Sequence, residues 1–162
     1  MKAVAISGSP RSPSRSRALA ELALRLLAER GCDTRMIDLA ALPADALLAR
    51  AQSPAIDEAL AAVGEADIVV AATPTYRALY PGLLKCFFDL MPPGHLAGKR
   101  CLGLQTGIAP EHALSPEYGL APLFRSLDGL PTAMLYARDD EFQNGEPSDE
   151  LIARLRLSIA SI

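Results

Sequence analysis

Short apolar segments, each about the length of one strand of a β-sheet, recur along the chain. Residues 2–7 are apolar without alternation, which is typical of a strand that is covered on both faces. Residues 67–73 form the clearest buried strand in the sequence. The complete set of predicted strands is residues 2–7, 33–39, 67–73, 99–106 and 131–137.

Between the predicted strands, apolar residues recur at the spacing of helices that bury one face. Leu19 and Leu26 belong to one such stripe, which stops at Gly31, a typical C-terminal cap. Ser53 followed by Pro54 is a typical start of another helix. The predicted helices are residues 16–31, 53–65, 83–91, 116–127 and 148–162, and residues 40–52 read as an irregular connection with one helical turn.

The alternation of strand and helix predicts an α/β protein whose parallel sheet is wrapped by helices on both faces. Five strands suit the flavodoxin-like, doubly wound order 2-1-3-4-5, within a single domain that spans residues 1–162. In such sheets, ligands bind beyond the carboxyl ends of the strands, at the switch point between the first and third. We therefore expect the loops that follow residues 7 and 73 to meet at a binding site.

The composition narrows the class of partner. Half of the 162 residues are hydrophobic, so the chain is long enough to bury a core of its own. The 16 basic and 19 acidic residues give a net charge of -3 without long blocks of one sign, so neither nucleic acid nor an acidic membrane is expected as a partner. No apolar run approaches the roughly 20 residues of a membrane span, and the N-terminal run is too short for a signal peptide. Small molecules and other copies of the chain are therefore the expected partners.

Cysteine usage predicts a reducing compartment. Cys32, Cys86 and Cys101 lie far apart, are odd in number and form no CxxC pair. This pattern argues against a disulfide framework. We expect a soluble, cytoplasmic protein.

The loop after the first strand, GSPRSPSRS at residues 8–16, has the chemistry of an anion site. Its serines offer hydroxyl donors, Arg11 offers a charged fork, and the following helix presents unpaired N–H groups at the positive end of its dipole. Because neither GxGxxG nor GxxxxGK[ST] is present, a mononucleotide fits better than ATP or a tightly held dinucleotide. The alternative is a mobile loop, or a serine that only caps the helix.

Two later loops offer a place for a planar ring at the same edge of the sheet. Residues 73–77 supply hydroxyls and the aromatic face of Tyr76, although Pro74 could simply end the strand while Tyr76 and Tyr80 cover the core. After the fourth strand, Gly107 allows backbone N–H groups to approach the polar edge of a ring, but an ordinary turn would use a glycine too. Because these loops are expected at the same edge of the sheet as residues 8–16, we favour the interpretation that they bind a ligand.

Residues for metal binding or covalent catalysis form no motif in this sequence. His95 and His112 are the only histidines and show no metal-ligand spacing, so no metal site is predicted. Neither a GxSxG elbow nor a cysteine with a histidine at motif spacing occurs. A phosphate site without acids or nucleophiles is typical of a protein whose cofactor supplies the chemistry.

Taken together, five segments resemble the NAD(P)H-dependent FMN reductase family, in particular the flavin reductase component of two-component alkanesulfonate monooxygenases. They cover nearly the whole chain, and the stretch TPTYRALYPGLLK is the most specific part. The segments are GSPRSPSRS at residues 8–16, QSPAIDEAL at 52–60, ATPTYRALYPGLLKCFFDLMP at 72–92, LAGKRCLGLQTG at 96–107 and PEYGLAPLFRSL at 116–127.

The resemblance implies an NAD(P)H:FMN oxidoreductase in which hydride passes from the nicotinamide to FMN. By position, it assigns the phosphate contacts to the first loop and the ring contacts to the two later loops. The residues that it implies are Ser9, Arg11, Ser14 and Ser16 for the FMN phosphate, and Pro74, Thr75, Tyr76, Thr106 and Gly107 for the ribityl chain and the ring. It does not decide between NADPH and NADH.

The resemblance further implies a homo-oligomer, a tetramer or a dimer, that supplies reduced FMN to a flavin-dependent monooxygenase. Tyr118 would then lie in a widened, π-type turn at the oligomer interface beside the flavin; the alternative for Tyr118 is a packing role alone. Two other functions stay open. One is a reductase that keeps FMN tightly bound and acts on quinones, azo compounds or metal ions. The other is a non-enzymatic module, either a flavodoxin-like electron carrier or a nucleotide-binding regulator.

Overall fold

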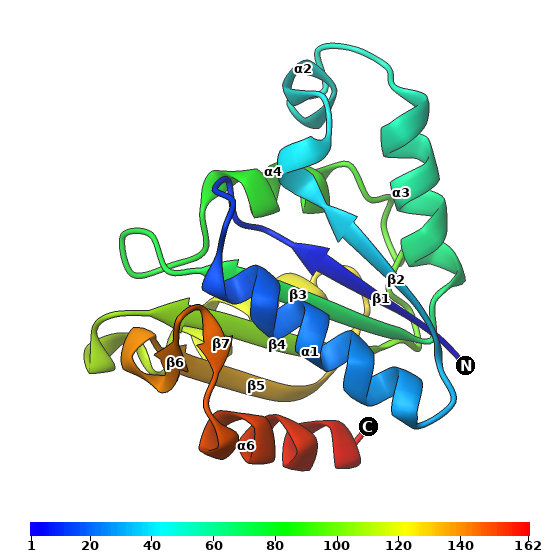
Figure 1. Cartoon of the computed structure of the whole chain (residues 1–162). Coiled ribbons are helices and arrows are strands. Elements are labelled where there is room, and N and C mark those ends of the chain that lie inside the picture. The colour runs from blue at the N-terminus through cyan, green and yellow to red at the C-terminus, as the bar shows by residue number, and fades with distance from the viewer.

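Five parallel strands form one sheet in the order β2-β1-β3-β4-β5, which confirms the predicted flavodoxin-like topology (Figure 1). The computed structural model describes residues 1–162. The strands are β1 (Lys2–Ser7), β2 (Asp33–Asp38), β3 (Ile68–Pro74), β4 (Arg100–Gly107) and β5 (Leu130–Arg138). Each begins and ends within two residues of the segment that its apolar pattern predicts.

The helices cover both faces of the sheet (Figure 1). Because neighbouring residues of a strand point to opposite faces, Val4 and Ile6 pack with helices α2 to α5, whereas Ala3 and Ala5 pack with α1 and α6. The helices are α1 (Arg15–Glu29), α2 (Ala44–Leu47), α3 (Pro54–Glu65), α4 (Gly82–Asp89), α5 (Ala121–Arg125) and α6 (Asp149–Ala160), with short 3₁₀ turns η1 (Leu39–Ala41), η2 (Pro110–His112) and η4 (Asp139–Glu141). None of the helices combines the length and the apolar character that crossing a membrane requires.

Residues 116–127 differ from the continuous helix that their pattern predicts. The segment starts with a π-helical turn, η3 (Pro116–Leu120), and only then continues as α5. Tyr118 lies in this turn, and Gly119 packs so tightly that a Cβ atom there would come within 2.5 Å of Leu79 Cδ1. The π-turn therefore lies directly against the loop that follows β3.

The polar run after β5 folds into a small hairpin that the sequence pattern did not predict. Strands β6 (Phe142–Gln143) and β7 (Glu146–Pro147) pair antiparallel around Asn144 and Gly145, which have φ angles of +51° and +88°. Positive φ at both turn residues is the conformation for which Asn-Gly is the preferred sequence. The hairpin lies beside the first turns of α1 (Figure 1).

The carboxyl ends of β1, β3 and β4 lie at one edge of the sheet. In the β1–β3 ladder Ser7 is opposite Ala72, and in the β3–β4 ladder Pro74 is opposite Thr106. The ladders extend one bond into the loops, because the N–H group of Gly8 donates to Ala72 O at 2.8 Å. The three loops that carry the predicted ligand residues therefore converge.

Candidate functional site

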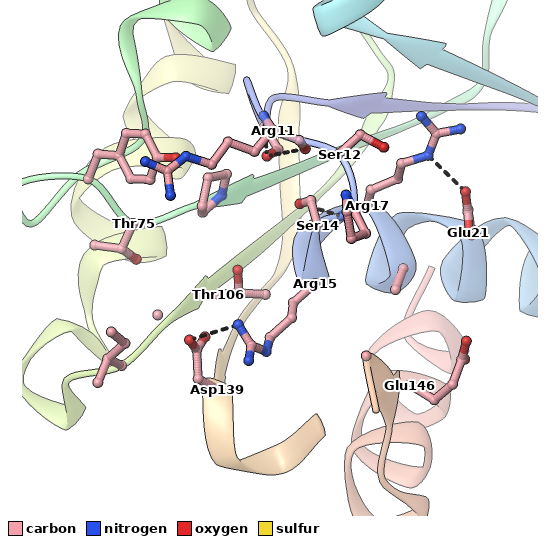
Figure 2. A pocket seen from close by; sticks show the side chains of 18 of the residues that line it. Arg11, Ser12, Ser14, Arg15, Arg17, Glu21, Thr75, Thr106, Asp139 and Glu146 are labelled. Atoms are coloured by element: carbon pink, nitrogen blue, oxygen red, sulfur yellow. Dashed lines mark hydrogen bonds and ion pairs between the residues drawn. The ribbon is translucent and has the colours of Figure 1, made fainter. Parts of the chain in front are cut away.

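A cavity of about 1060 Å³ opens where these loops converge. One side of it is the serine wall, residues 9–18, which connects β1 to the first turn of α1. The opposite side belongs to the threonine wall, residues 74–79 and 105–109 at the ends of β3 and β4, of which residues 74–76 and 106–109 line the cavity. Figure 2 shows Arg11, Ser12 and Ser14 on the serine wall facing Thr75 and Thr106 of the threonine wall. Glu21, His112, Asp139 and the tip of the β6–β7 hairpin complete the lining.

The serine wall is held by hydrogen bonds within its own segment. Ser9 Oγ donates to Arg11 O at 3.0 Å and accepts from the Arg11 N–H group at 3.1 Å. Ser14 is the N-cap of α1, accepts from the Arg17 N–H group at 3.4 Å and lies 2.9 Å from Ser16 Oγ. The first turn of α1 contains no acidic residue, so its positive dipole end is left without a counter-charge.

Of the three arginines that line the cavity, only Arg11 has no carboxylate partner. Arg15 pairs with Asp139 at 3.1 Å, and Arg17 pairs with Glu21 at 3.0 Å (Figure 2). Arg17 also pairs with Asp38. The hydrogen bond to Glu21 and the charge of Asp38 raise the pKa of Arg17 above its usual value. Arg11 is thus the cation of the serine wall that is free to pair with an anionic ligand.

The threonine wall is held by bonds between segments that are distant in the sequence. The N–H group of Thr75 donates to Thr106 O at 2.7 Å, which ties the loop after β3 to the end of β4. Tyr136 Oη, on β5, donates to Ala109 O at 2.8 Å. Burial raises the pKa of Tyr136, so the phenol keeps its proton at neutral pH and remains a donor.

Gly107 is the most crowded position of the threonine wall. A Cβ atom there would lie 2.5 Å from Tyr136 Oη and 3.0 Å from Thr75 Oγ1. Such separations are too short for a side chain to be accommodated without moving its neighbours. The packing of Tyr136 and Thr75 therefore favours glycine at this position.

A turn with unusual backbone angles follows Thr75. Arg77 and Ala78 have φ angles of +52° and +68°, and Tyr76 and Leu79 pair across them. A left-handed conformation costs a residue with a side chain roughly 1–2 kcal/mol, so contacts from elsewhere in the fold must hold this turn. One such contact is the hydrogen bond from Ser115 Oγ to Ala78 O at 2.8 Å.

The structure brings most of the predicted site residues to the cavity. Those that line it are Ser9, Arg11, Ser14, Pro74, Thr75, Tyr76, Thr106 and Gly107. Ser16 lies behind this surface, buried and bonded to Ser14, and is not a lining residue. Tyr118 lies outside the cavity, and 76% of its surface is exposed.

Sequence reasoning missed the other lining residues. Arg15, Arg17 and Asp139 line the cavity but had been assigned no role, because the pairs of Arg15 with Asp139 and of Arg17 with Asp38 join distant segments and leave no local pattern. The hairpin tip did leave a signal, since Asn-Gly between two short segments is the strongest short-range sign of a β-hairpin.

Comparisons with known proteins agree on one family. Residues 1–141 match the family described as NADPH-dependent FMN reductase. An FMN reductase (NADPH) of Pseudomonas aeruginosa is 38% identical over 97% of this chain and 88% of its own length. The NADH-dependent FMN reductase SfnF of Pseudomonas fluorescens is 35% identical over 98% of this chain and 88% of its own. The crystal structure of an apo NADH:FMN oxidoreductase (EMOB) has a TM-score of 0.89 at 37% identity, covering 98% of this chain and 86% of that one.

Proposed function

The chain belongs to the NADPH-dependent FMN reductase family, and we propose that it reduces FMN with NADH or NADPH and passes the reduced flavin to a separate monooxygenase. The observation that carries the proposal is Arg11, an unpaired cation in the loop that leads into α1, which lines one cavity together with Thr106 and Gly107. This arrangement suits a phosphate at one wall and a ring at the other. An alkanesulfonate monooxygenase is the candidate partner, because the sequence resembles the reductase component of such systems.

The residues present fit FMN. Arg11 and the unpaired N–H groups of α1 would hold the phosphate, with the hydroxyls of Ser9 and Ser14 beside it. Pro74, Thr75 and Tyr76 would line the ribityl chain and the ring. The Cβ-free backbone at Gly107, which the packing behind it enforces, supplies the close approach that a ring edge needs.

When bound, FMN supplies the hydride-accepting chemistry, and the protein contributes orientation and electrostatics. Backbone N–H groups near Thr106 and Gly107 would stabilise negative charge at the polar edge of the ring. Single ligands usually occupy pockets of about 300–1,000 Å³, and this cavity of about 1060 Å³ is slightly larger than that range. The cavity therefore has room for a nicotinamide beside the flavin.

The test is steady-state oxidation of NADPH and NADH with free FMN, FAD or riboflavin as the varied acceptor. We expect saturable turnover with free FMN, and the two nicotinamide cofactors compared in parallel will give the preference. Failure to oxidise either cofactor at saturating FMN would contradict the proposal and favour an electron carrier. Stoichiometric FMN that co-purifies, with turnover of quinones but not of free FMN, would favour a reductase with a resident flavin.

We further propose that the chain acts as a homo-oligomer, a tetramer or a dimer, with Tyr118 at the interface beside the flavin. Supporting this, Ile108, Leu114 and Tyr118, which lie within eleven residues of one another in the chain, are 83%, 59% and 76% exposed, and Ile108 lines the cavity. Exposed apolar side chains that lie together are typical of interaction surfaces. We also propose a cytoplasmic location, because Cys32, Cys86 and Cys101 are free thiols and the cytoplasm keeps thiols reduced.

Tyr118→Ala tests the interface. We expect a smaller mass in sedimentation equilibrium and weaker FMN retention, because the substitution removes the largest exposed side chain of the π-turn. Tyr80→Phe, in the neighbouring loop, is the control and should keep the wild-type mass. Unchanged mass and unchanged FMN affinity for Tyr118→Ala would leave this residue without either role.

A further inference from the structure

We propose that Gln105 is a positioning residue that sets the shape of the threonine wall, although it does not line the cavity. It does so by fastening the turn after β3 to β4 and to the start of the π-turn. The inference rests on the proposed function, since the wall is expected to face the flavin ring. Gln105 is fully buried within β4.

The side-chain amide of Gln105 joins two segments that are far from it in the sequence. Its Nε2 atom donates to Thr75 Oγ1 at 2.9 Å and to Ser115 Oγ at 2.8 Å. Ser115 Oγ in turn donates to Ala78 O at 2.8 Å. One amide group thus fixes both ends of the turn formed by residues 75–78.

The turn that Gln105 fastens needs such support. Arg77 and Ala78 are both held at positive φ, a conformation that residues with side chains rarely adopt, and Ala78 O is the atom that Ser115 anchors. Thr75, at the start of the turn, lines the cavity next to Thr106 on the threonine wall (Figure 2). Loss of the anchor would let the turn relax, and the cavity would lose part of its preformed shape.

The role of Gln105 in positioning the turn can be separated from a role in stability. Gln105 Oε1 is buried and has no hydrogen-bond partner, which destabilises the folded protein. Methionine has nearly the same length and no polar acceptor to bury. In Gln105→Met, removal of the unpartnered acceptor should offset the loss of the two donated bonds, so the stability of the ligand-free protein should be unchanged or higher. Flavin binding should weaken in the same variant, because Thr75 and Ser115 lose their shared donor.

The experiment measures both properties in Gln105→Met. Thermal unfolding without ligand should give a Tm at or above that of the wild type. Titration followed by flavin fluorescence should give Kd values for FMN and for riboflavin that both rise by about three- to tenfold, because the wall faces the ring that the two flavins share. Gln52→Met, which makes the same substitution at an exposed position away from the cavity, is the matched control and should change neither Tm nor Kd.

A second variant tests the route from Gln105 to the turn. Ser115→Ala removes the anchor of Ala78 but keeps the bond from Gln105 to Thr75, so its effect on Kd should be smaller. The double variant should bind flavin no more weakly than Gln105→Met alone, since both changes act through one connection.

Two results would overturn the inference while leaving the proposed function intact. One is wild-type Kd values for both flavins in Gln105→Met. The other is a fall of Tm and affinity together in that variant, which would reduce Gln105 to ordinary packing. Failure of the wild-type protein to bind either flavin would instead reject the proposed function, and the inference with it.

Discussion

The two walls of the cavity are built by different kinds of contact. On the serine wall, Ser9 bonds to Arg11 and Ser14 bonds to Arg17, so each bond spans two or three residues. On the threonine wall, the bond from Gln105 to Thr75 spans 30 residues and the bond from Tyr136 to Ala109 spans 27. One wall is shaped by its own sequence, and the other by the packing of β3, β4 and β5.

This difference separates the roles that the walls can play. The serine wall combines an unpaired arginine with a helix N-terminus, so its contribution depends on the charge of the ligand. The threonine wall is braced from behind by neutral groups, so its contribution depends on shape. Comparing FMN with riboflavin, which lacks the phosphate, is the direct way to separate the two contributions.

The largest expected effect is at the serine wall. Arg11→Ala should weaken FMN binding by about 1.5–3 kcal/mol, because a charge-assisted bond to the phosphate is lost, and should affect riboflavin much less. Titration of both flavins gives the two Kd values. Arg25→Ala, at an exposed position of α1 away from the cavity, is the control and should affect neither. Equal losses of affinity for FMN and riboflavin would show that Arg11 does not bind the phosphate.

A substitution on the threonine wall is expected to weaken the binding of FMN and riboflavin equally. In Gly107→Ala, the added Cβ would meet Tyr136 Oη at 2.5 Å, and displacing that phenol breaks its bond to Ala109. We expect the free energy of unfolding to fall by about 1–3 kcal/mol and both flavins to bind more weakly, by similar factors. Urea unfolding and flavin titration measure the two changes.

Gly82→Ala is the control for this crowding effect. No atom lies within 4 Å of a Cβ built on Gly82, and its φ is not positive, so stability should be kept or improved. If Gly107→Ala were as stable as Gly82→Ala and bound both flavins normally, the wall would be less rigid than its contacts indicate.

The smallest expected effect separates helix capping from ligand binding on the serine wall. Ser14 and Ser148 cap α1 and α6 with bonds of 3.4 and 3.3 Å to backbone N–H groups. Replacing either with alanine should lower the free energy of unfolding by about 1 kcal/mol. Only Ser14→Ala should also weaken FMN binding, because Ser148 lies away from the cavity. Equal FMN affinities in the two variants would leave Ser14 as a cap alone.

Several parts of the structure could be predicted because their causes are local. The apolar run of residues 2–7, the cap at Ser14 and the positive φ of Gly31 are each determined by nearby residues, and α1 and β1 appear where they are expected. Strand order 2-1-3-4-5 followed from alternation together with the handedness of parallel crossovers. The lining of the cavity by Ser9 and Arg11 followed from their place after the first strand.

Other parts could not be predicted because their causes are distant in the sequence. The apolar period of residues 116–127 predicts an unbroken helix, and only the family resemblance indicated the π-turn at Tyr118, which lies where Leu79 packs against Gly119. Arg15 and Arg17 are paired, and Arg11 is not, because Asp139 of η4 and Asp38 at the end of β2 lie next to them in the folded protein.

By itself, then, the sequence determined the sheet, its order and the anion-binding character of the serine wall, because periodicity, capping and the chemistry of one loop act over a few residues. The tertiary structure alone decided which arginine is free, how Gly107 is crowded and that Gln105 connects the turn after Thr75 to Ser115. These features arise where strands that are distant in the chain meet at one edge, and hydrogen bonds and steric contacts between them exist only once the sheet has formed.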